Sequence, residues 1–349
     1  MGLRVIINGQ FYHSTVTGVQ RYAREICREL DLLAKDDEFI LALPPETEDV
    51  PVFENIRVVK IGKLHNRLWE QVSFRAFVRK SKGIALNLCN VGPLFNPDVV
   101  CIHDIKVKVC PQYFNRLFAL VLSAVFKIET RRSGRIITVS NFSRNEIASC
   151  FNVDKDKITV APNSWQHYSR LGYDENALDK YGLRGKKYCY AMSSLEPNKN
   201  YVWIARIAEQ NPDLTFAVAG CSFQKVFRSG QDFDCPKNMV FLGYVSDSEA
   251  KALSRSCSAF LFPTFYEGFG IPPLEAISAG CRCIVVSDTD VMHEVYGTVA
   301  NYIDPHKYEC DLEKLKVMEE SEATGVLEKY SWKQSAETIY ECTEQVKNG

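Results

Sequence analysis

Two glutamates, Glu267 and Glu275, stand eight positions apart in a stretch that also carries two glycines and two prolines. It reads Phe-Pro-Thr-Phe-Tyr-Glu-Gly-Phe-Gly-Ile-Pro-Pro-Leu-Glu-Ala, residues 262–276. Gly268 and Gly270 let the backbone approach a ligand closely, and free N–H groups at a following helix start can bind an anion. The pattern therefore predicts a ligand site in which carboxylates lie beside anion-binding N–H groups.

The elements around this stretch are a short strand and a helix. Residues 258–262, Ser-Ala-Phe-Leu-Phe, are mostly apolar, as in a buried strand, and prolines at 272 and 273 fit the first turn of a helix. Gly280 is typical of the helix C-cap. Glu267 then lies in the turn at the carboxyl edge of a sheet, where open α/β sheets bind ligands, and Glu275 lies about one turn into the helix.

Strand-like runs alternate with helical patterns along the whole chain, which predicts parallel βαβ units. The expected strands are 4–7, 38–43, 56–59, 84–87, 99–103, 135–140, 188–193, 215–220, 239–242, 259–263 and 282–287. Helices are expected at 19–30 and 68–81. We therefore expect an α/β fold of two doubly wound, Rossmann-like halves, joined by a polar, irregular segment at about 163–179.

The glutamate stretch resembles the Glu-x7-Glu motif of retaining glycosyltransferases of family 4, which have the GT-B fold. Further segments resemble that family in the same order along the chain. They are Phe-Leu-Gly-Tyr-Val-Ser-Asp at 241–247, Ala-Gly-Cys-Arg-Cys-Ile-Val-Val-Ser at 279–287, His-Glu-Val at 293–295 and Tyr-Ser-Trp at 330–332. The resemblance implies two Rossmann-like domains that face a cleft, with domain boundaries at 1–168 and 169–331. It also implies that helix 332–349 packs back on the first domain.

The resemblance implies roles for the residues of the motif. Glu275 would accept hydrogen bonds from the ribose hydroxyls of a nucleotide. Glu267 would contact the transferred sugar and stabilise positive charge at its anomeric carbon. The N–H groups of Gly268, Phe269 and Gly270 would hold sugar and phosphate oxygens, which is electrostatic stabilisation of a leaving diphosphate.

A turn at 193–200, Ser-Ser-Leu-Glu-Pro-Asn-Lys-Asn, resembles the family's diphosphate-binding turn. Lys199 matches the lysine that neutralises the phosphates. Family members usually carry an arginine at the position of Ser194 or Asn198, so this chain lacks one bidentate phosphate clamp. The loop around Tyr244 and Val245 is expected to contact the base and the sugar.

The N-terminal half carries two further candidates. Gly18 lies in Thr-Gly-Val-Gln-Arg-Tyr at 17–22, where a helix opens and N–H groups could meet a diphosphate. His103 follows a buried strand, and in the family such a histidine faces the donor sugar. A plain glycine turn and a structural histidine are the alternatives for these two positions.

The whole-chain composition narrows the class of protein. The 349 residues are 46% hydrophobic and 24% charged with a net charge of −1, which fits a soluble globular protein and not a nucleic-acid binder. The 13 cysteines include no Cys-x-x-Cys pair, and the start lacks a signal-peptide pattern, so a cytoplasmic protein is expected. The apolar run 117–126 is too short to span a membrane and is interpreted as a core helix.

Two surface features leave alternatives open. Basic residues crowd positions 60–82, interleaved with aromatic ones, and this stripe could rest on anionic lipid headgroups or be a solvated helix face. Asp288 and Asp290 form an Asp-x-Asp, but family 4 enzymes do not use one, and helix capping explains it. We expect no metal and no cofactor.

The reaction that the resemblance implies is transfer of a sugar from a nucleotide diphosphate sugar to a hydroxyl of a glycan or lipid-linked glycan, with retention, in bacterial polysaccharide, O-antigen or capsule assembly. Mannosyl- and rhamnosyltransferase-like members are the most similar. A nucleotide-sugar epimerase and a non-catalytic nucleotide-sugar-binding module are the alternatives. A nicotinamide dehydrogenase is excluded because Phe11 follows Asn8-Gly9-Gln10 where Gly-x-Gly-x-x-Gly is needed.

Overall fold

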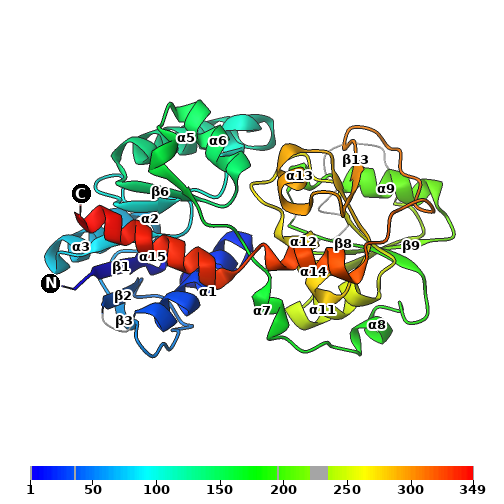
Figure 1. Cartoon of the computed structure of the whole chain (residues 1–349), viewed down its shortest axis with the longest axis horizontal. Coiled ribbons are helices and arrows are strands. Elements are labelled where there is room, and N and C mark those ends of the chain that lie inside the picture. Colours follow the sequence, from blue (N-terminus) through cyan, green and yellow to red (C-terminus); the bar gives the residue numbers. More distant parts are fainter. Residues whose placement is uncertain (1, 35–36, 195, 221–234, 349) are drawn as a thin grey trace. The chain divides into compact units, whose positions relative to one another are not determined.

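A computed structural model describes residues 2–34, 37–194, 196–220 and 235–348. They form two compact units, here called unit 1 (1–163 and 331–349) and unit 2 (164–330). Each unit is a parallel sheet covered by helices, so the expected α/β class is confirmed (Figure 1). Leu195, part of the turn at 193–200, lies outside the described residues.

Unit 1 is built on a seven-stranded sheet of order β3-β2-β1-β4-β5-β6-β7, parallel throughout. Its strands are β1 (Arg4–Asn8), β2 (Glu38–Leu43), β3 (Arg57–Lys60), β4 (Ile84–Asn87), β5 (Val99–Cys101), β6 (Arg135–Thr138) and β7 (Ile158–Val160). The order reverses between β1 and β4, so the carboxyl ends of these two strands flank the switch point at which such sheets bind ligands.

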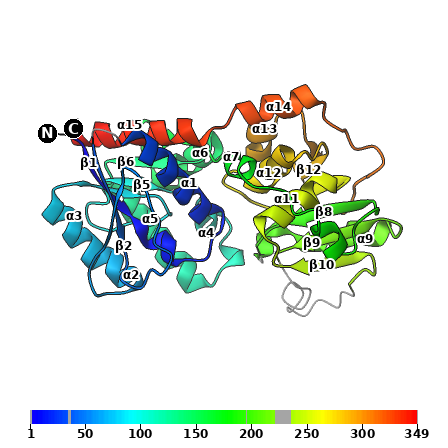
Figure 2. The same ribbon diagram turned by 90° about the horizontal axis from the view of Figure 1, so that it is seen from below.

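The helices of unit 1 cover both faces of this sheet (Figure 2). They are α1 (Gly18–Leu33), α2 (Asn66–Leu68), a π-helical turn at Trp69–Phe74, α3 (Arg75–Ser81), α4 (Lys106–Val109), α5 (Arg116–Arg132), α6 (Asn141–Phe151) and α15 (Trp332–Asn348). Single 3₁₀ turns lie at Gly9–His13, Pro111–Tyr113 and Lys155–Lys157. The segment from α2 to α3 packs on β1, β2 and β4, whereas α5 and α6 pack on β5 to β7.

The last helix of the chain, α15, lies beside α1 (Figure 1). The Trp332 ring meets the edge of Tyr22 at a centroid distance of 5.7 Å, and the Tyr340 ring stacks on Phe39 at 5.9 Å. The Ser335 hydroxyl donates to the Pro162 carbonyl at 2.7 Å. The two ends of the chain therefore build one unit together.

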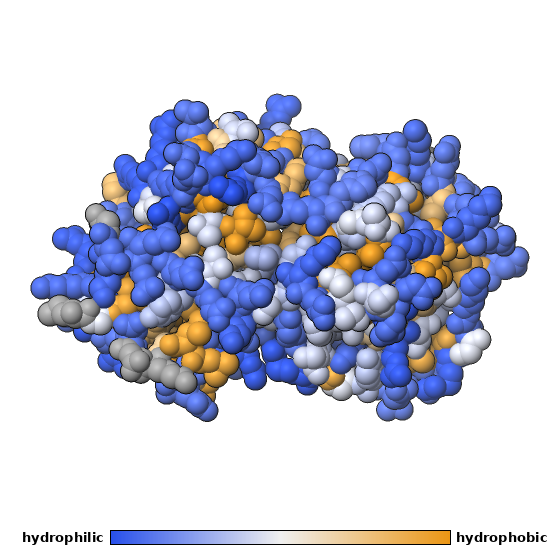
Figure 3. All heavy atoms as spheres, in the orientation of Figure 1, coloured by the Kyte–Doolittle hydropathy of each residue, from blue (hydrophilic) through white to orange (hydrophobic). Residues whose placement is uncertain are grey.

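One interpretation of the sequence is wrong in detail, and a second feature differs from its sequence pattern. The run 117–126 is not simply a core helix, because Leu117 and Leu120 are 71% and 70% exposed on α5. In the basic segment 60–82, Trp69 and Phe74 are fully buried, whereas Leu68 and Val72 are 65% and 53% exposed. In the space-filling view, apolar atoms reach the surface in places between hydrophilic side chains (Figure 3).

Unit 2 has a six-stranded parallel sheet of order β10-β9-β8-β11-β12-β13. Its strands are β8 (Tyr188–Met192), β9 (Thr215–Ala219), β10 (Met239–Gly243), β11 (Ala259–Phe262), β12 (Ile284–Ser287) and β13 (Asn301–Ile303). Its helices are α7 (Gln166–Ser169), α8 (Ala177–Lys180), α9 (Tyr201–Gln210), α11 (Asp247–Ser256), α12 (Ile271–Ala279), α13 (Asp290–Tyr296) and α14 (Glu320–Glu328), with a 3₁₀ turn at Pro197–Lys199. α9 packs on one face in a cluster around Trp203.

The start and the end of α12 agree with the signals in its sequence. Prolines occupy its first turn, and Gly280 caps its end at φ 109°, which confirms both expectations from the sequence. Within the described parts of the chain, none of the helices combines the length and apolar character needed to cross a bilayer.

Candidate active site

An ion pair between Lys199 and Glu267 lies at the carboxyl edge of the unit 2 sheet. Lys199 Nζ is 2.6 Å from Glu267 Oε1, and the two side chains are 12% and 15% exposed. Lys199 ends the turn after β8, and Glu267 lies in the loop between β11 and α12. Because β8 and β11 are neighbours in the sheet, the topology alone brings these loops together.

Asn198 fastens the same two loops. Its side-chain Nδ2 donates to the Tyr266 carbonyl at 3.1 Å, and its own carbonyl accepts from the Phe265 N–H at 2.8 Å. The residue is 1% exposed, and its Oδ1 has no hydrogen-bond partner. Asn198 therefore joins two loops through buried hydrogen bonds, at a position where the family that the sequence resembles often has an arginine.

The loop before α12 is held in a conformation that requires glycine. Gly270 has φ 91°, and a Cβ there would lie 2.6 Å from the Met292 methyl group. The Tyr296 hydroxyl donates to the Gly270 carbonyl, and the Phe269 ring meets the Tyr330 ring edge-on at 5.1 Å. These contacts fix the backbone that precedes the free N–H groups of α12.

Glu275 points to a residue that the sequence did not single out. Its Oε1 accepts a hydrogen bond of 2.7 Å from His167 Nε2, and the side chains are 7% and 3% exposed. His167 lies on α7, inside the segment expected to be an irregular joint. The aromatic neighbours Trp165 and Tyr168 are the signal in the sequence that this segment is packed.

Four further candidates from the sequence lie in the loops that follow β8, β10 and β11. Ser194 is exposed after β8, and its carbonyl accepts from the Tyr201 hydroxyl at 3.4 Å. Tyr244 is 89% exposed after β10, whereas Val245 is buried. Gly268 lies between Glu267 and Phe269 in the loop that opens α12.

In unit 1 the structure links the two candidates through Tyr22. Gly18 is the first residue of α1, after the N-cap Thr17, and the Tyr22 ring on the same helix meets His103 edge-on at 4.7 Å. His103 Nε2 donates to the Leu88 carbonyl at 2.9 Å, since a carbonyl can only accept. Burial lowers the pKa of His103, which keeps the ring neutral near pH 7.

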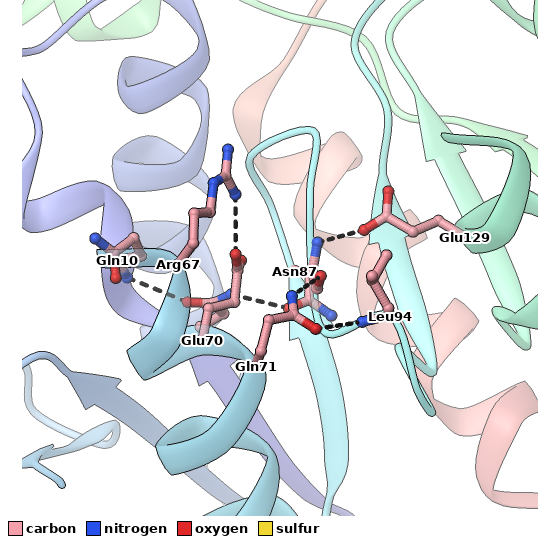
Figure 4. A network of polar contacts seen from close by, with 9 residues as sticks. Gln10, Arg67, Glu70, Gln71, Asn87, Leu94 and Glu129 are labelled. Carbon is pink, nitrogen blue, oxygen red and sulfur yellow. Dashed lines mark hydrogen bonds and ion pairs between the residues drawn. The ribbon is translucent and has the colours of Figure 1, made fainter. Parts of the chain in front are cut away.

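A buried polar network lies at the carboxyl ends of β1 and β4 (Figure 4). Asn8 Nδ2 donates to Glu70 Oε1 at 2.9 Å and to Asn87 Oδ1 at 3.0 Å. Across the loop after β4, the Gly92 N–H donates to Glu129 Oε1 at 2.6 Å. Burial raises the pKa of Glu70 and raises that of Glu129 to about 8. The network anchors the loop from which Leu88 contacts His103.

The two aspartates of the Asp-x-Asp segment have structural roles within unit 2. Asp288 Oδ1 lies 2.6 Å from His293 Nε2, and Asp290 opens α13 after the N-cap Thr289. Among the described residues, no cluster of three or more histidine, cysteine or acidic side chains has the arrangement to hold a metal ion.

The site in unit 2 therefore combines one cation, two carboxylates and a helix start. Lys199 and the N–H groups of α12 are suited to an anion such as a phosphate. Glu267 and Glu275 are suited to accept hydrogen bonds from hydroxyl groups. These are the functional groups that recognise a phosphorylated, hydroxyl-rich ligand.

Comparisons with known proteins agree with this chemistry. Residues 174–324 match the family model described as "Glycosyl transferases group 1". The O-antigen chain mannosyltransferase RfbU of Salmonella typhimurium is 27% identical over 255 residues, which cover 70% of this chain and 69% of that protein. The O-antigen chain mannosyltransferase B of Escherichia coli is 29% identical over 226 residues, which cover 60% of this chain and 57% of that protein.

Solved structures show the same fold. Sucrose-phosphate synthase from Thermosynechococcus elongatus superposes with a TM-score of 0.74 at 13% identity over all of both chains. Anabaena HepE, solved with UDP and glucose, gives 0.64 at 14% identity over 97% of this chain and 98% of that one. Fold and sequence matches together identify an enzyme of the glycosyltransferase class with the GT-B fold. The segment that matches the glycosyl transferases group 1 model lies within unit 2.

Proposed function

We propose that this enzyme transfers a hexose from a nucleotide diphosphate sugar to a hydroxyl of a glycan or lipid-linked glycan, with retention at the anomeric carbon. Mannose is the first candidate, because two relatives are named as O-antigen mannosyltransferases. The same names support a place in bacterial polysaccharide or O-antigen assembly. The protein would then act in the cytoplasm, at the inner face of the membrane when the acceptor is lipid-linked.

The observation that carries the proposal is the Lys199–Glu267 pair beside the start of α12. A donor diphosphate would lie at the helix N-terminus and take Lys199 as its counter-ion. Glu267 would then be released toward the sugar, where its carboxylate stabilises positive charge that develops at the anomeric carbon. Glu275, held by His167, would accept hydrogen bonds from the ribose.

The transfer step needs no further base in this proposal. The bond between the anomeric carbon and the diphosphate oxygen breaks, and a bond to the acceptor oxygen forms on the same face of the sugar. The acceptor proton passes to the departing diphosphate oxygen. Lys199 and the α12 N–H groups stabilise the negative charge on that leaving group, which is the main electrostatic task of the site.

A panel of nucleotide diphosphate sugars without acceptor tests the proposal. Slow release of nucleoside diphosphate from one donor, abolished by Glu267→Gln and kept by the exposed control Glu313→Gln, is the expected result. Silence across the panel, without thermal stabilisation by any nucleotide, would contradict it. A changed sugar without acceptor would instead indicate an epimerase.

We also propose that turnover requires no metal ion. Lys199 and the helix N-terminus supply the positive charge at the diphosphate in this scheme. Release that persists in excess EDTA is the expected result, and loss of release that added Mg²⁺ or Mn²⁺ restores would overturn the proposal.

A further inference from the structure

One helix of unit 1 exposes apolar side chains where a surface helix normally carries polar ones. On α5, Leu117 and Leu120 are 71% and 70% exposed, and Val121 is 55% exposed. Their spacing of three and four residues places them on one helix face. The opposite side of α5 packs into the core through Phe126. The exposed apolar face is therefore additional to the face that the fold uses.

The apolar surface continues beyond this face. Phe118 is 52% exposed, and its ring lies 6.0 Å from that of Phe114. The short helix α4 contacts α5 and exposes Val109 to 40%. We call this set the α4–α5 surface: Val109, Leu117, Phe118, Leu120 and Val121. Exposed apolar side chains gathered on two contacting helices are of a kind that marks an interaction site.

Basic residues predominate around the α4–α5 surface, with the acidic Asp104 and Glu146 near Cys110 as the exceptions. The basic residues between positions 106 and 132 are Lys106, Lys108, Arg116, Lys127, Arg131 and Arg132. The one acidic residue in that range is Glu129, which is fully buried. The whole chain has a net charge of −1, so this concentration of positive charge is local.

We propose that the α4–α5 surface docks on an anionic phospholipid bilayer. Apolar side chains flanked by lysine and arginine are what an interfacial helix presents to acyl chains and phosphate headgroups. With 17 residues α5 is roughly 25 Å long, which suits a helix lying in the interface plane better than one that spans. A second copy of the chain fits less well, because it would bring basic residues against basic residues.

This surface differs from the basic stripe at 60–82. That stripe has positive charge, but its aromatic residues Trp69 and Phe74 are fully buried. The stripe also exposes Leu68 and Val72, at 65% and 53%, but the α4–α5 surface exposes a larger apolar set, with Leu117, Phe118, Leu120 and Val121 at 52–71%. The inference goes beyond the proposed reaction, because docking requires neither donor nor acceptor.

Vesicle flotation with the full chain tests the docking. We expect binding to vesicles of phosphatidylcholine with one quarter phosphatidylglycerol, and at least tenfold weaker binding to phosphatidylcholine alone. The double substitution Leu117→Ser/Leu120→Ser should weaken binding to the anionic vesicles at least tenfold. The control Val52→Ser/Val317→Ser removes residues that are 94% and 65% exposed elsewhere and should leave binding unchanged.

Three outcomes would overturn the proposal. They are no flotation with anionic vesicles, equal binding of the α5 variant and the wild type, or loss of binding on Lys63→Glu/Lys80→Glu with the α5 variant unaffected. A concentration-dependent dimer in sedimentation that the α5 variant abolishes would assign the surface to a second copy instead. Donor hydrolysis measured without vesicles is independent, so its failure would touch only the proposed reaction.

Discussion

His167 Nε2 lies 2.7 Å from Glu275 Oε1, and both side chains are buried within unit 2. The two residues are 108 positions apart in the sequence. A buried carboxylate that accepts such a hydrogen bond has its orientation restricted. His167 is thus a positioning residue for the glutamate that we assign to the ribose.

Replacing His167 by alanine is expected to raise the KM for the donor about tenfold, with a smaller change in kcat, because a hydrogen bond to a charged group is worth about 1.5 kcal/mol or more. His167→Gln keeps an N–H donor and should recover most of the loss. Steady-state kinetics with the donor found in the panel measures both. The exposed control His65→Gln should behave as wild type, and equal kcat losses in both His167 variants would argue against positioning.

Lys199→Ala should lower the rate of nucleoside diphosphate release about 10²–10³-fold, as removal of one charge-stabilising donor does in other enzymes. Lys186→Ala, at an exposed position of the same unit, is the matched control. Single-turnover measurements separate chemistry from donor binding. Full activity in Lys199→Ala would remove the residue from the diphosphate site.

Ser194→Arg should strengthen donor binding up to about tenfold, since an arginine can bind a phosphate through charge-assisted, bidentate hydrogen bonds. Ser194 is exposed, so the larger side chain has room. Asn198→Arg should instead destabilise the fold, because that side chain is buried between two loops. Isothermal titration with nucleotide and urea unfolding distinguish the two results.

Gly270→Ala should lower the free energy of unfolding by about 1–3 kcal/mol, because φ is 91° and the new Cβ would meet Met292. At Gly172 a new Cβ would meet no other atom, and the backbone is not in the left-handed region. Gly172→Ala should therefore change the free energy of unfolding by less than about 0.5 kcal/mol. Urea unfolding of the two variants measures the difference. Equal stability would show that the loop before α12 relaxes freely.

Because of the buried Glu129, the free energy of unfolding of unit 1 should fall as the pH rises. Its pKa is raised to about 8 by burial, so the folded state binds a proton more tightly than the unfolded state. The stabilisation is present at low pH and is lost as pH rises through 8, by about 3 kcal/mol between pH 5 and 8. Urea unfolding of wild type and Glu129→Gln across that range checks this. Parallel pH profiles for the two proteins would disprove it.

Much of the fold could be predicted because its signals are local. Apolar runs marked the strands, and two prolines and a glycine bounded α12. The loops of Lys199 and Glu267 came together because adjacent parallel strands end at one edge. Local patterns also explain why β13 was missed: its three residues, Asn301–Ile303, include a polar one and no alternation.

The remaining features depend on long-range packing. His167 meets Glu275 although 108 positions separate them in the sequence, and nothing near His167 in the sequence marks that contact. On α5 the spacing of apolar residues is the same whether a face meets the core or the solvent, so the exposed face was mistaken for core. The sequence shows Asn198 as a departure from a family pattern, but it does not show that this residue joins two loops by hydrogen bonds.

The pairing of α15 with α1 has a consequence for synthesis. A ribosome delivers residues 1–163 before unit 2, and unit 2 before α15. Tyr22 and Phe39 therefore lack their ring contacts until Trp332 and Tyr340 have been synthesised. Unit 2 can fold while unit 1 still exposes apolar surface, so nascent chains are most open to aggregation and to chaperones in the unit that was made first.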